Sequence, residues 1–263
     1  MAGRVRLVDS HCHLNADRFE RDADQVLGAA RLGGVERILV PGWNVASSER
    51  ALALAEGCPW IDVAVGVHPH DASAVDEAGW ARIVRLAADR RVVAIGETGL
   101  DFDRGFSPVE DQLANLRRNL DLALELDRPV ILHCRSAVGR RDAQDALLDE
   151  IRAARGVRPV IHSFSGPIDY AKAMLELGAV VSFSGLVFRA GEEASAEVAT
   201  LVAKERLLVE TDSPFLSPLG APRSRNEPSW VRVTAEWLAD QRGVTHQALG
   251  ESLVSTYDEV FRA

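Results

Sequence analysis

The feature that most constrains the fold is a set of eight short apolar runs, which alternate with longer segments of helical pattern. Continuous apolar runs of this kind are typical of parallel strands that are covered on both faces. We therefore expect strands at residues 5–10, 37–42, 61–67, 92–98, 129–134, 159–164, 179–185 and 207–212.

Two of the intervening segments show clear helical periodicity. In residues 110–126 the apolar side chains recur at three- and four-residue steps, which predicts one buried stripe along a helix. Its members are Leu113, Leu116, Leu120, Ala123 and Leu124. Residues 142–156 form a second amphipathic segment, which ends at Gly156, a usual helix terminator.

Strand and helix alternate eight times without a low-complexity linker, and 47% of the residues are hydrophobic, enough for a large core. This order predicts an α/β fold in which residues 1–263 form a single (β/α)8 TIM barrel domain. An open doubly wound sheet is the competing architecture. No glycine-rich phosphate loop follows the first run, which argues against that alternative.

Composition limits the cellular setting and the partners. No apolar run is long enough to cross a membrane and no export signal opens the chain, so we expect a cytoplasmic protein without a membrane or obligate protein partner. Three cysteines give no paired framework, as expected in a reducing compartment. The formal charge of -9 argues against binding nucleic acid by bulk electrostatics, although bound metal ions can supply positive charge locally.

Ionisable residues concentrate where the expected strands end. Six of the seven histidines lie there, and only His246 falls in a helical segment. Because the carboxyl ends of barrel strands converge on one face, these groups are expected to meet and to form a metal site. They are His11, His13, His68, His70, His133 and His162, together with Asp9, Glu97, Asp101, Asp212 and Arg135.

The stretch "DSHCHL" illustrates the pattern, since period-two alternation points His11 and His13 the same way and Cys12 the other. Six candidate ligands suffice for two cations if a carboxylate bridges them. A carboxylated lysine cannot serve as the bridge, because Lys172 and Lys204 lie in helical segments, whereas Glu97 ends the fourth strand. The candidate ligands are His11, His13, Glu97, His133, His162 and Asp212.

Imidazole and carboxylate ligands suit Zn²⁺, Mn²⁺, Co²⁺ or Fe²⁺, and Mg²⁺ if waters complete the shell. The sequence leaves the choice among these ions open.

Seven short motifs spread over residues 9–228 resemble those of the TatD family of metal-dependent deoxyribonucleases. They are "DSHCHL", "GVHPH", "GETGLD", "ILHCR", "HSFSG", "ETDSPFLSP" and "RNEP". The resemblance implies a TIM-barrel hydrolase of the amidohydrolase-like group that binds two divalent cations. By matching position, His11, His13, Glu97 and Asp212 would hold one cation, and Glu97, His133 and His162 the other.

The chain departs from the family pattern at two places. Ser163 stands where the family often has cysteine, and Thr256 where it often has asparagine. Neither position belongs to the expected ligand set.

Catalytic and substrate roles follow from the same arrangement. We expect Asp212 to bind metal and to orient or deprotonate the attacking water, although a capping role before Pro214 is the structural alternative. With the bridging Glu97 it forms the expected catalytic pair. His70 is expected to contact substrate. Arg135 either binds a phosphate oxygen or pairs with a carboxylate such as Asp101, and Arg225 either binds phosphate or is a solvated loop charge.

Other residues near the expected mouth have open roles. His68 can contact substrate or support a ligand, and Asp101 can orient a liganding histidine or cap the following turn. Base stacking and packing are both open for the aromatic residues, with packing favoured for Phe164. The aromatic residues are Trp43, Phe102, Phe106, Phe164 and Phe188. Cys12 and Cys134 are expected to pack in the interior.

The favoured function is a metal-dependent deoxyribonuclease that cleaves phosphodiester bonds at single-stranded DNA ends by two-metal activation of water. The 3′–5′ exonuclease polarity rests on the resemblance alone. The alternative is a dinuclear hydrolase of another bond, such as an amide, an aminoacyl-tRNA ester or a small phosphoester. A non-catalytic barrel is a third interpretation, which retention of all six ligands disfavours.

Overall fold

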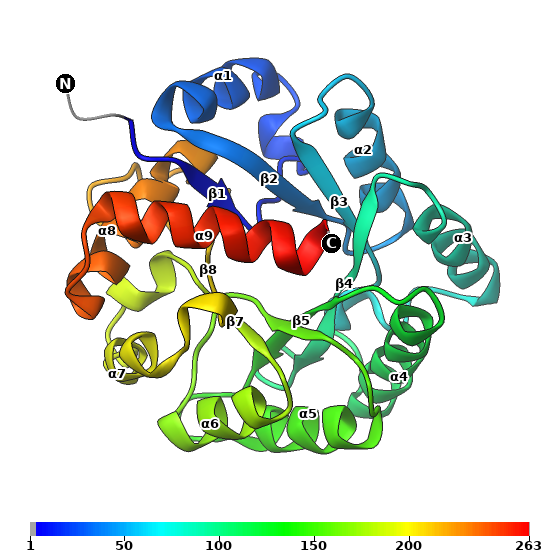
Figure 1. The fold of residues 1–263 in the computed structure, drawn as a ribbon. Helices are drawn as coiled ribbons and strands as arrows, with labels where there is room; N and C mark the ends of the chain where they lie inside the picture. Colours follow the sequence, from blue (N-terminus) through cyan, green and yellow to red (C-terminus); the bar gives the residue numbers. More distant parts are fainter. Residues whose placement is uncertain (1–3, 263) are drawn as a thin grey trace.

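All eight strands lie in one parallel sheet, and each pairs with the next along the chain (Figure 1). The computed structural model describes residues 4–262. The strands are β1 (Leu7–Asp9), β2 (Val35–Pro41), β3 (Ile61–Val65), β4 (Val92–Asp101), β5 (Val130–Arg135), β6 (Pro159–Ile161), β7 (Val180–Phe183) and β8 (Leu207–Val209).

Sequential strand order confirms the (β/α)8 barrel and rules out the doubly wound alternative, in which the strand order reverses. The last strand meets the first through Ser10, whose backbone N–H and hydroxyl each donate to the Val209 carbonyl at 3.1 Å. The barrel is therefore nearly closed.

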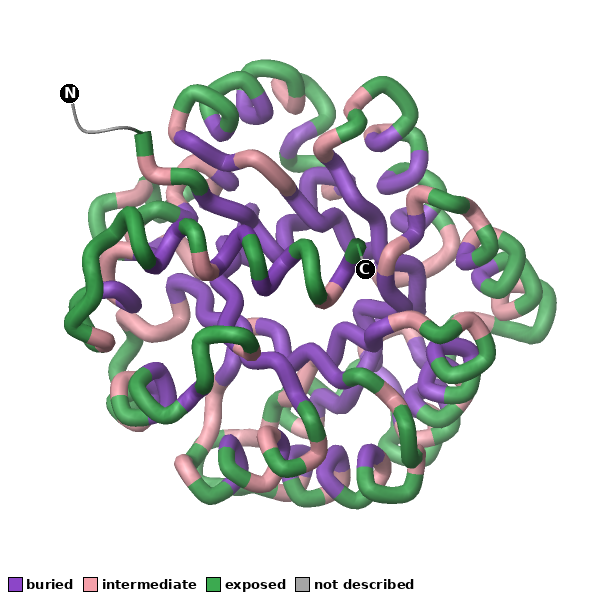
Figure 2. Tube along the Cα trace, in the orientation of Figure 1, coloured by how far each residue is buried: buried purple, intermediate pink, exposed green. Residues whose placement is uncertain are grey.

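Helices form the outer ring, with buried inner faces and exposed outer faces (Figure 2). They are α1 (Ala23–Gly33), α2 (Val45–Glu56), α3 (Glu77–Ala87), α4 (Val109–Glu125), α5 (Asp142–Ala153), α6 (Ile168–Glu176), α7 (Ala194–Leu201), α8 (Val231–Arg242) and α9 (His246–Phe261). Short 3₁₀ helices are η1 (Asp17–Phe19), η2 (Pro69–Asp71), η3 (Gly185–Phe188), η4 (Lys204–Arg206) and η5 (Pro228–Trp230). Among the described residues, every helix is too short or too polar to cross a membrane.

The buried face of α4 differs from the expected stripe. Leu116, Leu120 and Ala123 are buried as expected, but Leu124 is 40% exposed. The helix instead turns polar Gln112 and Asn115 inward, because their side chains bond to the ends of the neighbouring strands. Gln112 binds both backbone groups of Asp101, and Asn115 donates to the Val67 carbonyl at 2.7 Å.

The C-terminal helix α9 packs across the N-terminal end of the barrel (Figure 1). Tyr257 donates a hydrogen bond to Asp62 at the start of β3, and Thr256 donates to the Lys204 carbonyl before β8. Gly250 lies so close to β1 that a Cβ there would come within 2.4 Å of the Arg6 carbonyl oxygen. This end of the barrel is covered, and the strand ends that carry the ionisable residues lie at the other.

Candidate metal centre

Backbone hydrogen bonds bring the residues after β1 and β8 together. The Asp212 N–H donates to the His11 carbonyl at 2.9 Å, and the His13 N–H donates to the Ser213 carbonyl at 2.7 Å. The Nε2 atoms of the two histidines lie 3.1 Å apart. Asp212 Oδ1 lies 3.3 Å from His13 Nε2 and 3.7 Å from His11 Nε2, so the three side chains form one donor group.

Glu97 lies in β4, whose close approach to its neighbours depends on glycine. Gly99 has a φ of 137°, and a Cβ there would come within 2.0 Å of the His133 carbonyl oxygen. A Cβ on Gly66 would come within 2.6 Å of the Gly96 Cα. Because these side chains are absent, β4 passes tightly between β3 and β5 and carries Glu97 to the barrel centre.

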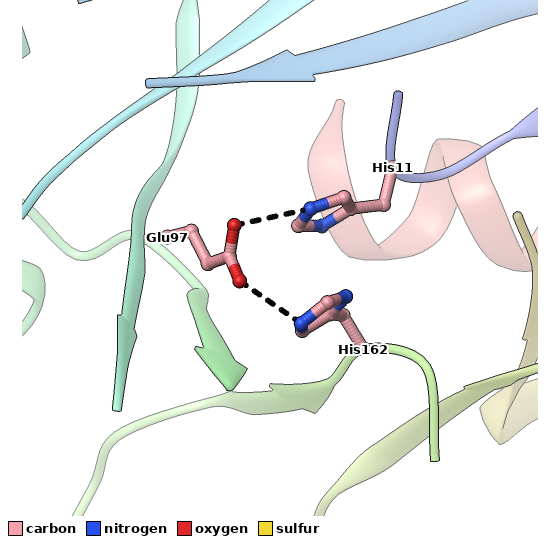
Figure 3. Close-up of side chains that lie close together, drawn as sticks. All are labelled: His11, Glu97 and His162. Atoms are coloured by element: carbon pink, nitrogen blue, oxygen red, sulfur yellow. Dashed lines mark ion pairs between the residues drawn. The ribbon is translucent and has the colours of Figure 1, made fainter. Parts of the chain in front are cut away.

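The two carboxylate oxygens of Glu97 face different donor groups. Oε2 lies 3.3 Å from His11 Nε2 and 3.4 Å from His13 Nε2. Oε1 lies 3.0 Å from His162 Nε2 and 3.3 Å from His133 Nδ1. Figure 3 shows Glu97 between the rings of His11 and His162, with one oxygen toward each. The structure thus brings together all six side chains expected as ligands.

His162 and His133 each have a carboxylate on the outer side of the ring as well as Glu97 on the inner side. His162 Nδ1 lies 3.1 Å from Glu210 Oε1, and His133 Nε2 lies 3.4 Å from Asp101 Oδ2. A ring that gives its hydrogen to the outer carboxylate presents the lone pair of its inner nitrogen, His162 Nε2 or His133 Nδ1, to a cation at Glu97.

His68 also reaches Glu97 Oε1, with its Nε2 at 3.3 Å, but its protonation differs. The His68 Nδ1 accepts the backbone N–H of His70 at 3.1 Å, so the neutral ring carries its hydrogen on Nε2. Burial lowers the pKa of His68 to about 4, which keeps the ring neutral. His68 therefore donates a hydrogen bond to Glu97 and has no lone pair to offer a cation there.

These contacts fit a bound cation. A nitrogen lone pair and a carboxylate oxygen 3.0 Å apart repel each other unless a proton or a cation lies between them. Burial alone would lower the pKa of His162, but the charge of Glu97 and the Glu210 hydrogen bond raise it well above its ordinary value. Burial alone would raise the pKa of Glu97, but the imidazoles of His162, His68 and His11 lower it well below its ordinary value. The pocket thus attracts positive charge.

The donor atoms fall into three overlapping groups, and within each group the atoms lie within 4.8 Å of one another. The groups are His11–Glu97–His162, His11–His13–Asp212 and His68–Glu97–His133, and in the last of these His68 offers a hydrogen rather than a lone pair. Imidazole nitrogen mixed with carboxylate oxygen is a donor set for Zn²⁺, Mn²⁺, Co²⁺ or Fe²⁺.

Glu210 is a functional residue that the sequence reasoning did not single out. It is fully buried, and its Oε1 is the partner of His162 Nδ1. The available signal was its position in "ETD", directly after the last strand and two residues before Asp212.

Asp101 performs both roles that the sequence left open. Its Oδ2 lies 2.7 Å from His70 Nε2 and faces His133, and its Oδ1 accepts the backbone N–H groups of Asp103 and Arg104. It therefore orients two histidines and caps the turn after β4. His70 keeps 30% of its side chain exposed at the mouth.

The two arginines expected near substrate already have carboxylate partners. Arg135 pairs with Asp103 at 2.7 Å, rather than with Asp101. Arg225 pairs with Asp22 at 2.7 Å and Glu227 at 2.8 Å, and its guanidinium lies over the ring of Phe19. The guanidinium of Arg225 is consequently neither solvated nor free to donate hydrogen bonds to a phosphate. It instead links the loop after β8 to the start of α1.

Two of the three residues expected to pack in the interior are buried there, and the third is partly buried. Phe164 is buried against Tyr170 and Phe183, as expected. Cys12 is fully buried beside Ser213, whereas Cys134 is only partly buried.

A parallel barrel with buried imidazoles and carboxylates at the carboxyl ends of its strands fits the class of metal-dependent hydrolases. Residues 8–262 match the family described as TatD related DNase. The chain belongs to this family and is a metal-dependent hydrolase that acts on ester bonds.

Relatives and a solved structure agree with this assignment. The chain is 39% identical over 247 residues to the 3′-5′ ssDNA/RNA exonuclease TatD of Cronobacter sakazakii, covering 90% of each chain. It is 35% identical over 256 residues to the uncharacterized metal-dependent hydrolase YabD of Bacillus subtilis, covering 97% of this chain and 99% of that one. The crystal structure of YjjV, a TatD homologue from Escherichia coli, superposes with a TM-score of 0.90 at 28% identity, covering 99% of this chain and all of the other.

Proposed function

We propose that the protein is a 3′–5′ exonuclease that cleaves phosphodiester bonds at the ends of single-stranded DNA, with two divalent cations bound. His11, His13, Glu97 and Asp212 would hold one cation, and Glu97, His133 and His162 the other. The observation that carries the proposal is the division of the Glu97 oxygens between two donor groups. The exonuclease named TatD among the relatives supports the choice of substrate.

Two such cations would lower the pKa of a water and offset the charge of the phosphodiester as it is attacked. In this proposal Asp212 takes the proton of that water. Its side chain is 12% exposed, compared with 3% for Glu97, so water entering from the mouth can reach it. Burial alone would raise its pKa, but the hydrogen bond from His13 and the nearby imidazoles lower it. Asp212 is thus ionised near neutral pH and can accept a proton.

His70 is the protein group best placed to contact substrate beside this centre. Asp101 holds its Nε2 at 2.7 Å, while the rest of the ring is partly open to solvent. Arg135 reaches a phosphate in this proposal only by exchanging its Asp103 partner, and Arg225 only by leaving both of its carboxylates.

The test incubates metal-loaded protein with single-stranded DNA labelled at either the 5′ or the 3′ end. We expect a descending ladder from the 5′ label and release of the labelled mononucleotide from the 3′ label. A chelator should stop both, and added Mn²⁺, Zn²⁺ or Mg²⁺ should restore them. Cleavage of carboxylic ester, amide or aminoacyl-tRNA substrates without DNA cleavage would overturn the proposal in favour of the alternative hydrolase.

A further inference from the structure

Two phenylalanines are exposed on this protein, and both lie beside the histidines of the candidate centre. The chain has eight phenylalanines, and within residues 4–262 only Phe106, at 64%, and Phe215, at 51%, are largely exposed. Phe106 follows β4 and its ring centroid lies 4.7 Å from that of His70. Phe215 follows β8 and lies 6.0 Å from His13.

Chains of contacts link the two phenylalanines to different oxygens of Glu97. Phe215 contacts His13, which faces Glu97 Oε2. Phe106 contacts His70, which packs against His68 at 4.3 Å, and His68 faces Oε1. Because the two chains of contacts end at different oxygens, we expect a phosphodiester bound at Glu97 to lie between the two phenylalanines.

Exposed phenylalanine rings leave apolar surface in water, and two of them beside one cluster of buried histidines are available for a ligand to cover. Every nucleobase has a flat face that stacks on an aromatic ring, independent of sequence. The charge distribution also favours stacking, because the chain carries -9 and the expected phosphate arginines, Arg135 and Arg225, are already paired.

We propose that Phe106 and Phe215 are two nucleobase-stacking sites, which bind the bases on either side of the scissile phosphodiester. The inference rests on the proposed nuclease function, and it specifies which side chains bind the bases at the strand end. Phe215 and Phe106 would each stack on a different base, namely the 3′-terminal base and its 5′ neighbour.

The test combines variants with abasic substrates. Phe106→Ala and Phe215→Ala should each lower kcat/KM for single-stranded DNA about fivefold to 100-fold, mostly through KM. Oligonucleotides carrying an abasic site at the last or the penultimate position remove one base at a time. The loss caused by each substitution should shrink below about twofold for one of the two positions, and that position should differ between the variants.

Further variants separate stacking from simple apolarity. Tryptophan at either position should restore the wild-type KM, whereas leucine should not. Leu32→Ala provides the matched control, since Leu32 is 79% exposed but lies near the end of α1, on the opposite side of the barrel.

Equal losses on intact and abasic DNA, or wild-type KM values in both alanine variants, would overturn the stacking sites while leaving the nuclease function intact. Failure of the wild-type protein to cleave any DNA would instead remove the proposed function itself.

Discussion

Glu210 is hydrogen-bonded to the outer nitrogen of His162: its buried Oε1 lies 3.1 Å from His162 Nδ1, while the opposite ring nitrogen lies 3.0 Å from Glu97. A carboxylate behind a histidine fixes the ring orientation and increases the basicity of the nitrogen that faces the cation. The ring orientation of His162, a proposed ligand, is therefore fixed by a buried carboxylate on its outer side.

The substitution Glu210→Gln should weaken metal binding. The glutamine side chain could still accept the Nδ1 hydrogen of His162 through its amide oxygen, but without the negative charge. We expect about a 10- to 100-fold loss of affinity for one cation, measured by calorimetric titration of metal-free protein. Circular dichroism should show an unchanged fold, and unaltered affinity for both cations would contradict the supporting role of Glu210.

The protonation of His68 predicts a difference in metal content between histidine variants. His162→Ala should bind one cation fewer than the wild-type protein, because it removes a proposed ligand whose Nε2 lies 3.0 Å from Glu97. His68→Ala should keep the full complement, because its Nε2 hydrogen already points at Glu97. Elemental analysis by mass spectrometry measures both. Loss of one equivalent in His68→Ala would show that His68 is a ligand.

Asp212→Asn should abolish most of the hydrolytic activity. An amide of the same shape can still occupy the site but cannot accept a proton, and general-base catalysis typically contributes about 10²- to 10⁴-fold to the rate. Single-turnover cleavage of labelled DNA gives the chemical rate. Asp240→Asn, at a carboxylate that is 76% exposed, serves as the control. An Asp212→Asn rate within about threefold of wild type would assign the proton transfer to another group.

Arg225 should contribute to stability in a pH-dependent way. Its hydrogen bond to Asp22 lowers the pKa of that carboxyl from 3.8, so the pairing stabilises the folded state above this pH and is lost as the pH falls through the lowered value. Arg225→Ala should lower Tm by roughly 2–4 °C at neutral pH. The gap to wild type should narrow in acid.

The control is Arg90→Ala, which changes an exposed arginine, whereas Arg225 is partly buried. A constant Tm difference between Arg225→Ala and wild type from neutral pH down to strongly acidic pH would contradict the ion-pair explanation.

The fold and the ligand cluster could be predicted because both follow from periodic, local signals. The apolar runs specified the strands, and the barrel rule places every strand end on one face, so histidines remote in sequence were expected to meet. The strand β4 ran longer than expected, to Asp101, because Gln112 of α4 binds both backbone groups of that residue.

The remaining features depend on partners that no local pattern encodes. The sequence shows that Arg225 lies in a loop after β8, but not that Asp22 and Glu227 lie within 2.8 Å of it. Likewise the difference between His68 and His162 depends on which group faces the outer nitrogen of each ring, a backbone N–H or a carboxylate. Leu124 fits the helical period but is 40% exposed, and the buried face of α4 also carries polar Gln112 and Asn115, whose side chains bond to strand ends.

The position of α9 has a practical consequence. Its contacts with Asp62 and Lys204 fix the last helix beneath the barrel, away from the histidines. A biotin acceptor or affinity tag joined beyond this helix would attach the protein to a sensor surface by its closed base. The catalytic opening would then face the bulk solution, so immobilised enzyme should remain open to strands of any length.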